Sequence, residues 1–333
     1  MDALLAHLLE AASRAPSAHN TQPWRLRWRG DALEVAVTEE RMLPAGDPHG
    51  VDTMHGLGAL LENVLLTLVQ RGYEGRYEVA DRLESAAPVV VVRWSAREGP
   101  PPEPTLYRMI PVRRTSRLPY RPTPVDGAAL DAMRAAASSP CALRVMSEPA
   151  RTLEIRRLVA EATALQLADH AIARELHAWM RFTPRDPRWH RDGLSAACLG
   201  WRPFEAAVAG RLLSPPVLGI LVRWGLHRAL CANVDQQAPP APTLCLLTVG
   251  GEESVAMRIE AGRCLQRVWL AAAAHGLVTH PLSAALDVAA TRPRTLTLFG
   301  IGAGERPVNL FRLGASNAPA RSARLTADEI LEG

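Results

Sequence analysis

The chain has 333 residues, 48% hydrophobic and 22% charged, a balance typical of a folded globular protein with one large domain or two fused units. All 38 basic residues are arginine, and the absence of lysine excludes Schiff-base aldolases, pyridoxal-phosphate enzymes, Walker A nucleotide binders and protein kinases. The net charge is +4, but the arginines are spread along the chain and aromatic residues make up only 5%, so we expect no nucleic-acid partner.

The first predicted elements are a helix over 4–13, a polar turn over 15–24 and a long helix over 58–72. Because Asp2 and Glu10 replace the positive charges of a signal peptide, we interpret the N-terminus as an amphipathic helix. The long helix ends at Gly72 and is followed by a valine-rich strand over 88–94.

A proline-rich stretch over 99–104 is typical of a linker. After it come an arginine cluster at 113–117, an alanine-rich helix over 128–138 and a strand over 139–145. The last elements are a long helix over 262–276 and a strand over 307–313. The glycine-rich segment 300–304 precedes this strand instead of following one, which favours a loop over a dinucleotide-binding turn.

Two stretches of the chain resemble each other. Residues 58–73 align with 262–277 at a constant offset of 204, and five of the sixteen positions are identical. Two unrelated buried helices with glycine caps would give the same match, but the order helix, turn, strand, long helix, strand also occurs twice. We therefore predict an N-terminal half over 1–98, a linker over 99–105 and a C-terminal half over 106–333.

The C-terminal half is longer because of an insertion at about 150–242. It contains predicted helices near 153–180, a loop over 184–193, more helix after Phe204 and a Pro-Pro-Ala-Pro end at 239–242. An insertion of this size is typical of a lid or wall over a site. Its apolar run over 206–226 is broken by two arginines and two prolines and fails the test for a membrane span, so we expect no membrane partner.

Two motifs suggest chemistry. The turn supplies Ser17, Asn20 and Gln22, which can recognise the edge of a planar heterocycle or simply cap a helix. The cluster at 113–117 places guanidinium groups beside two hydroxyls just before a helix, which suits a phosphate group or an ordinary solvated surface.

Together these motifs resemble the FMN-dependent nitroreductase family. Its arginine cluster for the FMN phosphate is matched by Arg113, Arg114, Thr115 and Arg117, and its flavin-lining turn by Pro16, Ser17, Asn20, Gln22, Pro23 and Trp24. The resemblance further implies that Pro281, Leu282 and Ser283 border the isoalloxazine, and that Arg321 and Arg324 match basic residues near the C-terminus of the family. Ser283 stands where many members have an acidic residue.

The chain departs from the family in having each motif once. The first half lacks an arginine cluster, and the second replaces the polar turn with Ser139-Pro140-Cys141. This is similar to the fused, Acg-like branch of the family. The resemblance implies an α+β, nitroreductase-like three-layer fold of two pseudo-symmetric halves, an internal dimer whose central sheets are flanked by helices. It also implies one FMN per chain and a monomer.

The resemblance implies an oxidoreductase that uses FMN and NAD(P)H to reduce a small nitroaromatic or quinone-like substrate by a ping-pong hydride mechanism. The alternatives are a flavin-sequestering protein with a closed lid, and a flavin-dependent dehydrogenase or oxidase of a biosynthetic intermediate. The flavin is then the reactive centre, and His19, Trp189 and His190 are candidates for contact with substrate. His170 and His177 on a predicted helix suggest packed or solvated histidines rather than a metal site. Five cysteines without metal or disulfide spacing favour a reduced, cytoplasmic protein.

Overall fold

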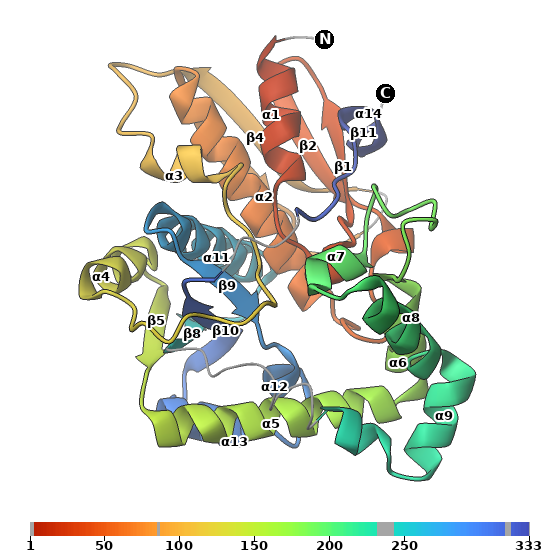
Figure 1. Ribbon diagram of the computed structural model, residues 1–333. Helices are drawn as coiled ribbons and strands as arrows, with labels where there is room; N and C mark the ends of the chain where they lie inside the picture. Colours follow the sequence, from red (N-terminus) through yellow and green to blue (C-terminus); the bar gives the residue numbers. More distant parts are fainter. Residues whose placement is uncertain (1–2, 85–86, 232–242, 317–320, 333) are drawn as a thin grey trace.

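The computed structural model describes residues 3–84, 87–231, 243–316 and 321–332. These residues form an α+β fold with a five-stranded sheet, a four-stranded sheet and helices against both (Figure 1). The strands are β1 (Trp24–Trp28), β2 (Ala32–Val37), β3 (Tyr73–Val79), β4 (Pro88–Ala96), β5 (Cys141–Met146), β6 (Met180–Arg181), β7 (Leu194–Ser195), β8 (Thr243–Gly250), β9 (Val278–Pro281), β10 (Glu305–Gly314) and β11 (Leu331–Glu332).

The longer helices match the predicted positions to within a few residues at most ends, except that α2 begins before residue 58 and α11 before residue 262. The helices are α1 (Ala3–Ser13), α2 (Val51–Gln70), α3 (Thr105–Met109), α4 (Gly127–Ala136), α5 (Pro149–Ala168), α6 (His170–Ala178), α7 (Ala196–Leu199), α8 (Pro203–Leu212), α9 (Pro215–Arg223), α11 (Val255–Ala274), α12 (Ala284–Asp287), α13 (Arg292–Phe299) and α14 (Ala327–Ile330). Two short 3-10 turns lie at Ala18–Asn20 and Glu39–Arg41.

The two sheets have the same strand order. The first runs β1-β2-β4-β3 and the second β5-β8-β10-β9, in both cases with neighbouring strands antiparallel. Each order follows the chain in the same way, because the long helix, α2 or α11, connects the second strand of the sheet to its edge strand. Four strands of the first sheet and the four of the second therefore follow one another in the same order.

The second sheet lies between two layers of helices. All but the last residue of β8 are buried, and alternate side chains point to opposite faces. Cys245 and Leu247 pack with α4 and α11, whereas Leu244 and Leu246 pack with α5, α12 and α13. Helix α5, which belongs to the insertion, therefore forms part of one of the two helix layers that cover this sheet.

The helices α2 and α11 cross at two glycines that are equivalent in the repeat. A Cβ atom on Gly58 would lie 2.0 Å from the carbonyl oxygen of Ile259, and one on Gly262 would lie 2.2 Å from that of His55. Because 55 and 259 also differ by 204, the contact is reciprocal, as in the interface of a two-fold dimer. Only glycine fits at this crossing, because each helix backbone occupies the space that the other residue's side chain would need.

The C-terminal segment crosses to the first half. Strand β11 pairs in parallel with β1, with Leu331 opposite Leu26, and α14 contacts α1. The final strand therefore belongs to the sheet of the first half, although it follows the predicted linker at 99–105 in the chain. The predicted end of the insertion at 239–242 lies outside the described residues.

Candidate functional site

The polar turn is held in an uncommon backbone conformation. His19, Asn20 and Gln22 have φ values of 48°, 57° and 54°, in the left-handed region that residues other than glycine seldom adopt. The Ser17 hydroxyl stabilises the turn by accepting a hydrogen bond from the Gln22 amide at 2.9 Å. Strain of this kind concentrates at functional sites, where the surrounding structure enforces it.

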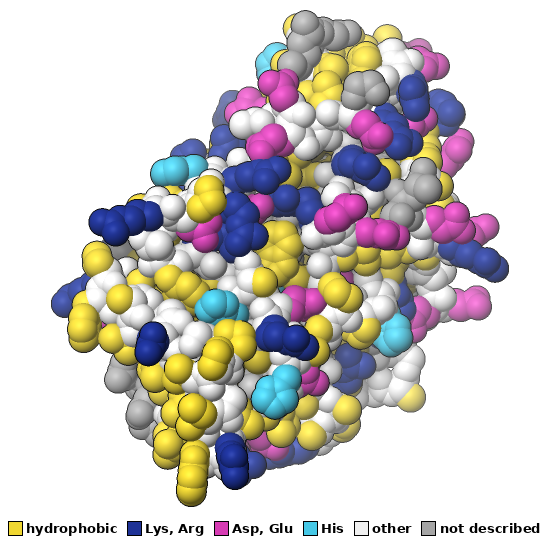
Figure 2. Space-filling view, turned by 90° about the vertical axis from the view of Figure 1, so that its right-hand side faces the viewer, with side chains coloured by type: hydrophobic (Ala, Val, Ile, Leu, Met, Phe, Trp, Pro, Cys, Tyr) yellow, Lys and Arg dark blue, Asp and Glu magenta, His cyan; other side chains and the backbone are white. Residues whose placement is uncertain are grey.

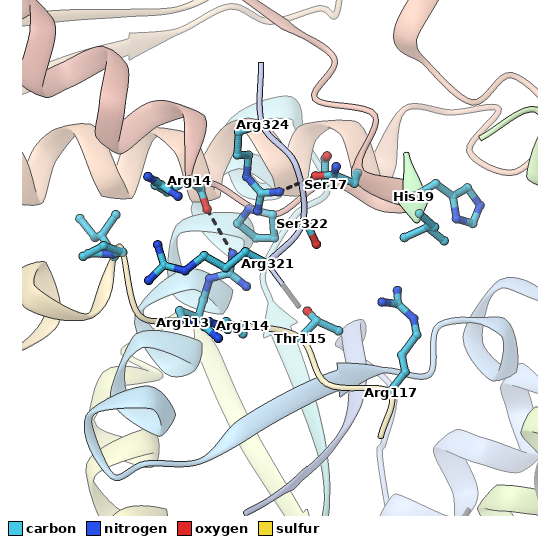
Figure 3. Close-up of a pocket in the computed structure, with 15 residues that line it drawn as sticks. Arg14, Ser17, His19, Arg113, Arg114, Thr115, Arg117, Arg321, Ser322 and Arg324 are labelled. Carbon is cyan, nitrogen blue, oxygen red and sulfur yellow. Dashed lines mark hydrogen bonds between the residues drawn. The ribbon is translucent and has the colours of Figure 1, made fainter. Parts of the chain in front are cut away.

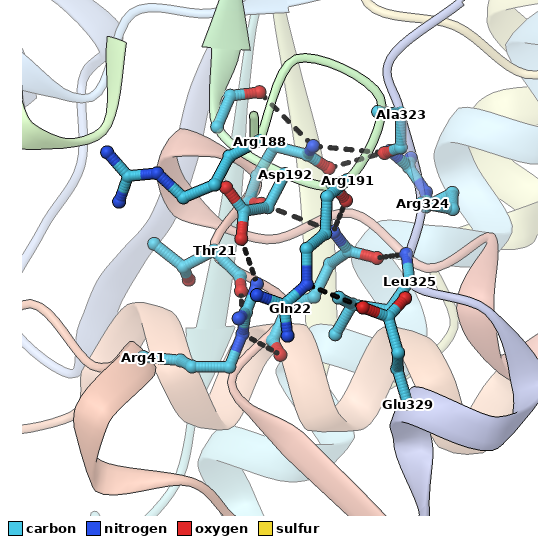
Figure 4. A network of polar contacts seen from close by, with 12 residues as sticks. Thr21, Gln22, Arg41, Arg188, Arg191, Asp192, Ala323, Arg324, Leu325 and Glu329 are labelled. Carbon is cyan, nitrogen blue, oxygen red and sulfur yellow. Dashed lines mark hydrogen bonds and ion pairs between the residues drawn. The ribbon is translucent and has the colours of Figure 1, made fainter. Parts of the chain in front are cut away.

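Contacts from two distant segments enforce this conformation (Figure 4). Asn20 donates from Nδ2 to the carbonyl oxygens of Gly193 and Ala323, at 3.2 and 3.1 Å, and its Oδ1 accepts from Arg324 at 2.6 Å. Gln22 is fully buried, donates to the carbonyl oxygen of Arg191 at 3.2 Å and accepts from the Leu325 amide at 2.8 Å. The turn thus joins the insertion to the C-terminal segment.

A buried carboxylate anchors the insertion at the same place. Asp192 is 2% exposed and accepts from Arg181 at 2.6 Å and from Arg41 at 2.8 Å. Arg41 also donates to the carbonyl oxygen of Thr21 at 2.7 Å, so the ion pairs connect the insertion to the turn. Two guanidinium groups on one buried carboxylate fix the loop firmly, because removing either side would leave a charge uncompensated.

The arginine cluster lies in an extended segment. The prediction that it directly precedes a helix is wrong, because α4 begins only at Gly127. Instead the segment runs beside β9, where the Ser116 amide donates to the carbonyl oxygen of Thr279 at 3.0 Å. Arg113 reaches across to the first half, donates to the carbonyl oxygen of Arg14 at 3.1 Å and lies over the Trp269 ring at 5.6 Å.

Six arginines line one open cavity (Figure 3). They come from the residue after α1, the extended segment and the C-terminal tail: Arg14, Arg113, Arg114, Arg117, Arg321 and Arg324. Pro16, Ser17, His19, Asn20, Thr115 and Ser322 are also at its wall, and none of the described residues that line it carries a carboxylate. We call this space the arginine cavity.

The arginine cavity is strongly positive. Burial, followed by the charge of Arg324, lowers the pKa of Arg113 to about 9, and burial, followed by the charge of Arg14, lowers the pKa of Arg324 to about 10. Arg14 forms a long ion pair with Glu10 at 3.9 Å, whereas the Nε atoms of Arg113 and Arg324 are buried without a hydrogen-bond partner. Guanidinium groups that lose hydration without gaining carboxylates indicate a site for an anion with several oxygens.

A second and larger cavity adjoins the first and shares Pro16, Ser17, His19, Thr115 and Arg117 with it. We call it the mixed cavity, because apolar and polar side chains both line it. The predicted residues Pro281 and Ser283 are at its wall. The insertion contributes Thr163, Gln166, Leu167, Ile172 and Leu176 from α5 and α6.

Polar groups in the mixed cavity have unused capacity for hydrogen bonds. Asn309 is 8% exposed and Trp269 3% exposed, and Asn309 Oδ1 and Trp269 Nε1 are buried without a partner. Burial, then the charge of Arg117, lowers the pKa of His19 to about 4, so its ring is neutral at pH 7. A planar ligand with hydrogen-bonding edges suits this space, and a phosphate group on the same ligand would reach the arginine cavity.

Six predicted residues lie at neither cavity. Pro23 and Trp24 are buried, and Gln22 supports the turn from behind. Leu282 places its amide on the carbonyl oxygen of Leu310 at 2.7 Å. Trp189 is half-buried and His190 exposed in the loop before Asp192. The structure thus brings together the other predicted site residues, and it assigns no cavity wall to these six.

Several residues at the cavities escaped the sequence analysis. Arg14 directly precedes the polar turn, and its position beside that motif could have indicated that it lies at the cavity. Asp52 and His55 on α2, and Asp287 on α12, line the mixed cavity without any local motif. Among the described residues, no group of three or more histidine, cysteine, aspartate or glutamate side chains is arranged to hold a metal ion. Glu175 instead accepts from the amides of Ala45 and Gly46.

No single helix in the described part of the chain is long and apolar enough to cross a membrane. Taken together, α8 and α9 have the length and composition of a membrane-spanning helix, but the two helices are bent by 66° relative to each other.

Comparisons with known proteins give distant relatives. No protein-family model matches the chain. It is 27% identical over 288 residues to the Mycobacterium tuberculosis protein named "Putative NAD(P)H nitroreductase Rv3131", covering 86% of this chain and 77% of that one. It is 27% identical over 124 residues to "Putative NAD(P)H nitroreductase acg" of the same organism, covering 35% of each.

Solved structures of low identity also align. One is the FMN- and NADPH-dependent nitroreductase NfnB of sphigopyxis sp. strain HMH, at 18% identity, a TM-score of 0.41 and coverage of 68% of this chain and 98% of that one. Another is a nitroreductase with bound FMN from Bacteroides fragilis, at 12% identity, a TM-score of 0.39 and coverage of 67% and 95%.

Proposed function

We propose that this chain, a member of the nitroreductase family, is an FMN-containing oxidoreductase that uses NAD(P)H to reduce a small electron-poor acceptor. The observation that carries the proposal is the arginine cavity, which opens beside a mixed cavity lined by both polar and apolar side chains. The relatives named as NAD(P)H nitroreductases support the choice of reductant.

The residues present fit FMN. Arg113, Arg114, Arg321 and Arg324 would hold the phosphate, because guanidinium groups bind phosphate oxygens in pairs. Thr115 and Ser17 lie where the two cavities join, while Pro281 and Ser283 would border the ring. Bound FMN supplies hydride acceptance and donation, and the protein positions it, excludes water and needs no nucleophile of its own.

A second function, flavin sequestration, is favoured by one observation. The α5 and α6 side chains form part of the wall of the mixed cavity, and Asp192 anchors their insertion. If the insertion stays closed, the protein would hold FMN without turning over. Reduction of an added acceptor therefore distinguishes a reductase from a flavin store.

We also propose that the chain is a duplicated and fused subunit that works as a monomer. The reciprocal contact at Gly58 and Gly262 supports this, because it already supplies within one chain the kind of interface that a dimer forms between two.

The cofactor is tested with Arg113→Ala, using Arg134→Ala as the control because Arg134 is half exposed and lies on α4. We expect FMN affinity to fall at least tenfold in Arg113→Ala, since a charge-assisted hydrogen bond contributes about 1.5–3 kcal/mol, and to be unchanged in the control. Flavin absorbance and fluorescence titration give the affinity, and circular dichroism verifies folding. Equal affinity in both variants would contradict the assigned phosphate site.

The reaction is tested by adding NADH or NADPH to the FMN-loaded protein without oxygen and following the flavin absorbance. Bleaching, followed by recovery when a quinone or nitroaromatic is added, is the expected result. Bound flavin that neither nucleotide bleaches would overturn the reductase and leave the store.

A further inference from the structure

The helices α8 and α9 expose an unusual amount of apolar surface. Eight large apolar side chains are exposed among the described residues, and five of them lie between residues 204 and 226. Phe204 is 79% exposed and Trp224 73%, followed by Ile220, Leu226 and Val208. Isolated exposed apolar residues are ordinary, but a concentration on one hairpin indicates a contact surface.

These side chains project outward because the opposite faces of the two helices are packed. Leu218 is buried and Val222 partly buried against α5 and α6, whereas Ile220 and Trp224, four positions apart, share the outer face of this segment. On α8, Phe204, Val208 and Arg211 share a face at helical spacing. Figure 2, which views the molecule from the side of α8 and α9 in Figure 1, shows hydrophobic side chains gathered at the lower left with arginines beside them.

The charge around this surface is of one sign. Residues 202–231 contain four arginines and one glutamate, a formal charge of +3, and all four arginines are exposed: Arg202, Arg211, Arg223 and Arg228. The glutamate, Glu205, accepts from the Arg202 amide at 2.7 Å as part of its own helix cap. The complementary partner is therefore apolar and negatively charged at once.

We propose that the α8–α9 hairpin docks on an anionic lipid surface. Apolar and aromatic tips enter the boundary between headgroups and acyl chains, while arginines keep their guanidinium groups at the level of the phosphates. The helices have ten and nine residues, or about 15 Å each, half the thickness of a bilayer core, so they lie on the membrane instead of spanning it.

A lipid surface fits this geometry better than a folded protein. The apolar tips come from two helices bent by 66°, and a fluid surface adapts to such a bend without a matching groove. This inference revises the expectation of no membrane partner, which rested on the failure of the same run as a span. Because Leu218 packs with Leu167 and Leu176 at the mixed cavity, docking would also place the wall of that cavity next to the lipid.

The test is sedimentation of the FMN-loaded protein with vesicles of phosphatidylcholine, with or without 30% phosphatidylglycerol. In the mixed vesicles about one lipid in three is anionic. We expect binding to the anionic vesicles, and a loss of at least tenfold in affinity for Phe204→Ser combined with Trp224→Ser. Leu153→Ser combined with Val112→Ser is the matched control, because both residues are exposed apolar side chains outside the hairpin. It should bind like the original protein, and 0.5 M salt should weaken binding, since surface charges are screened within about 4–5 Å at that concentration.

The proposal is overturned if the original protein ignores anionic vesicles, or if both double variants lose binding equally. It is also overturned if gel filtration shows an oligomer that the hairpin variant dissociates, because a second copy then covers the surface. Unchanged FMN content and circular dichroism show that the hairpin variant has folded, so its loss of binding reports on the surface alone.

Discussion

The two halves of the molecule share a scaffold but differ in the segments that connect it. Both sheets have one strand order, and α2 and α11 meet through equivalent glycines. Yet the polar turn over 16–24 exists only in the first half, and the extended arginine segment over 113–117 only in the second. The difference teaches that the repeated framework sets where a site can form, whereas the connections decide that it forms once.

We expect the largest effect on stability at the crossing of α2 and α11. In Gly58→Val, the new side chain meets backbone atoms of α11, which have no room to move, so we expect a loss of more than about 4 kcal/mol in the free energy of unfolding, or no folded protein. Gly127→Ala is the control, because a Cβ there meets nothing within 4 Å. Urea unfolding measures both, and a stable Gly58→Val protein would refute the close crossing.

Equivalent side chains at the same interface differ between the two halves. Glu62 is 4% exposed and accepts from Arg263 and Arg267 at 3.0 Å, while its equivalent in the repeat is Gln266. Glu62→Gln removes the buried charge but keeps the shape, and we expect it to lower the free energy of unfolding by about 1–3 kcal/mol. The matched change Glu78→Gln, at an exposed pair with Arg93, should cost less than about 0.5 kcal/mol. Equal effects would mean that the interface charges are solvated.

An effect that depends on pH concerns the turn that only the first half has. Since burial and Arg117 lower the pKa of His19 to about 4 in the folded protein, the unfolded chain binds a proton first as the pH falls from 6.5 to 4. His19 therefore lowers the free energy of unfolding as the pH falls through that range. Asparagine tolerates the positive φ, so His19→Asn should abolish the part of this decrease that His19 causes. Unfolding of both proteins at pH 7, 5.5 and 4.5 checks this. A stability difference that is the same at all three pH values would contradict the buried, neutral ring.

Much of the framework could be predicted because it rests on local signals. The helical spacing of apolar residues before Gly72 and Gly276 predicted α2 and α11, and both glycines adopt the positive φ expected after a helix. The cavities were predictable in part, since Arg113, Thr115 and the Ser17 turn lie in recognisable motifs. Trp189 and His190 were assigned to substrate because they lie in the insertion, yet they only flank its anchor.

The site residues that could not be predicted from the sequence depend on tertiary contacts. Asp192 matters through Arg41 and Arg181, and nothing in its local sequence shows that two arginines converge on it. Likewise Asp52 and Asp287 reach one cavity from different halves. Spacing along the chain cannot show which residues of separate elements meet across an interface.

The path of the C-terminal tail has a consequence for how the protein is made. Arg324 binds Asn20, which precedes it by 304 residues, and β11 then pairs with β1. During synthesis the polar turn therefore emerges well before Arg324, since 304 residues separate Asn20 from it. At about 5–20 residues per second, the turn waits at least some 15 seconds for its partner. The arginine cavity is thus complete only after the tail has reached the turn.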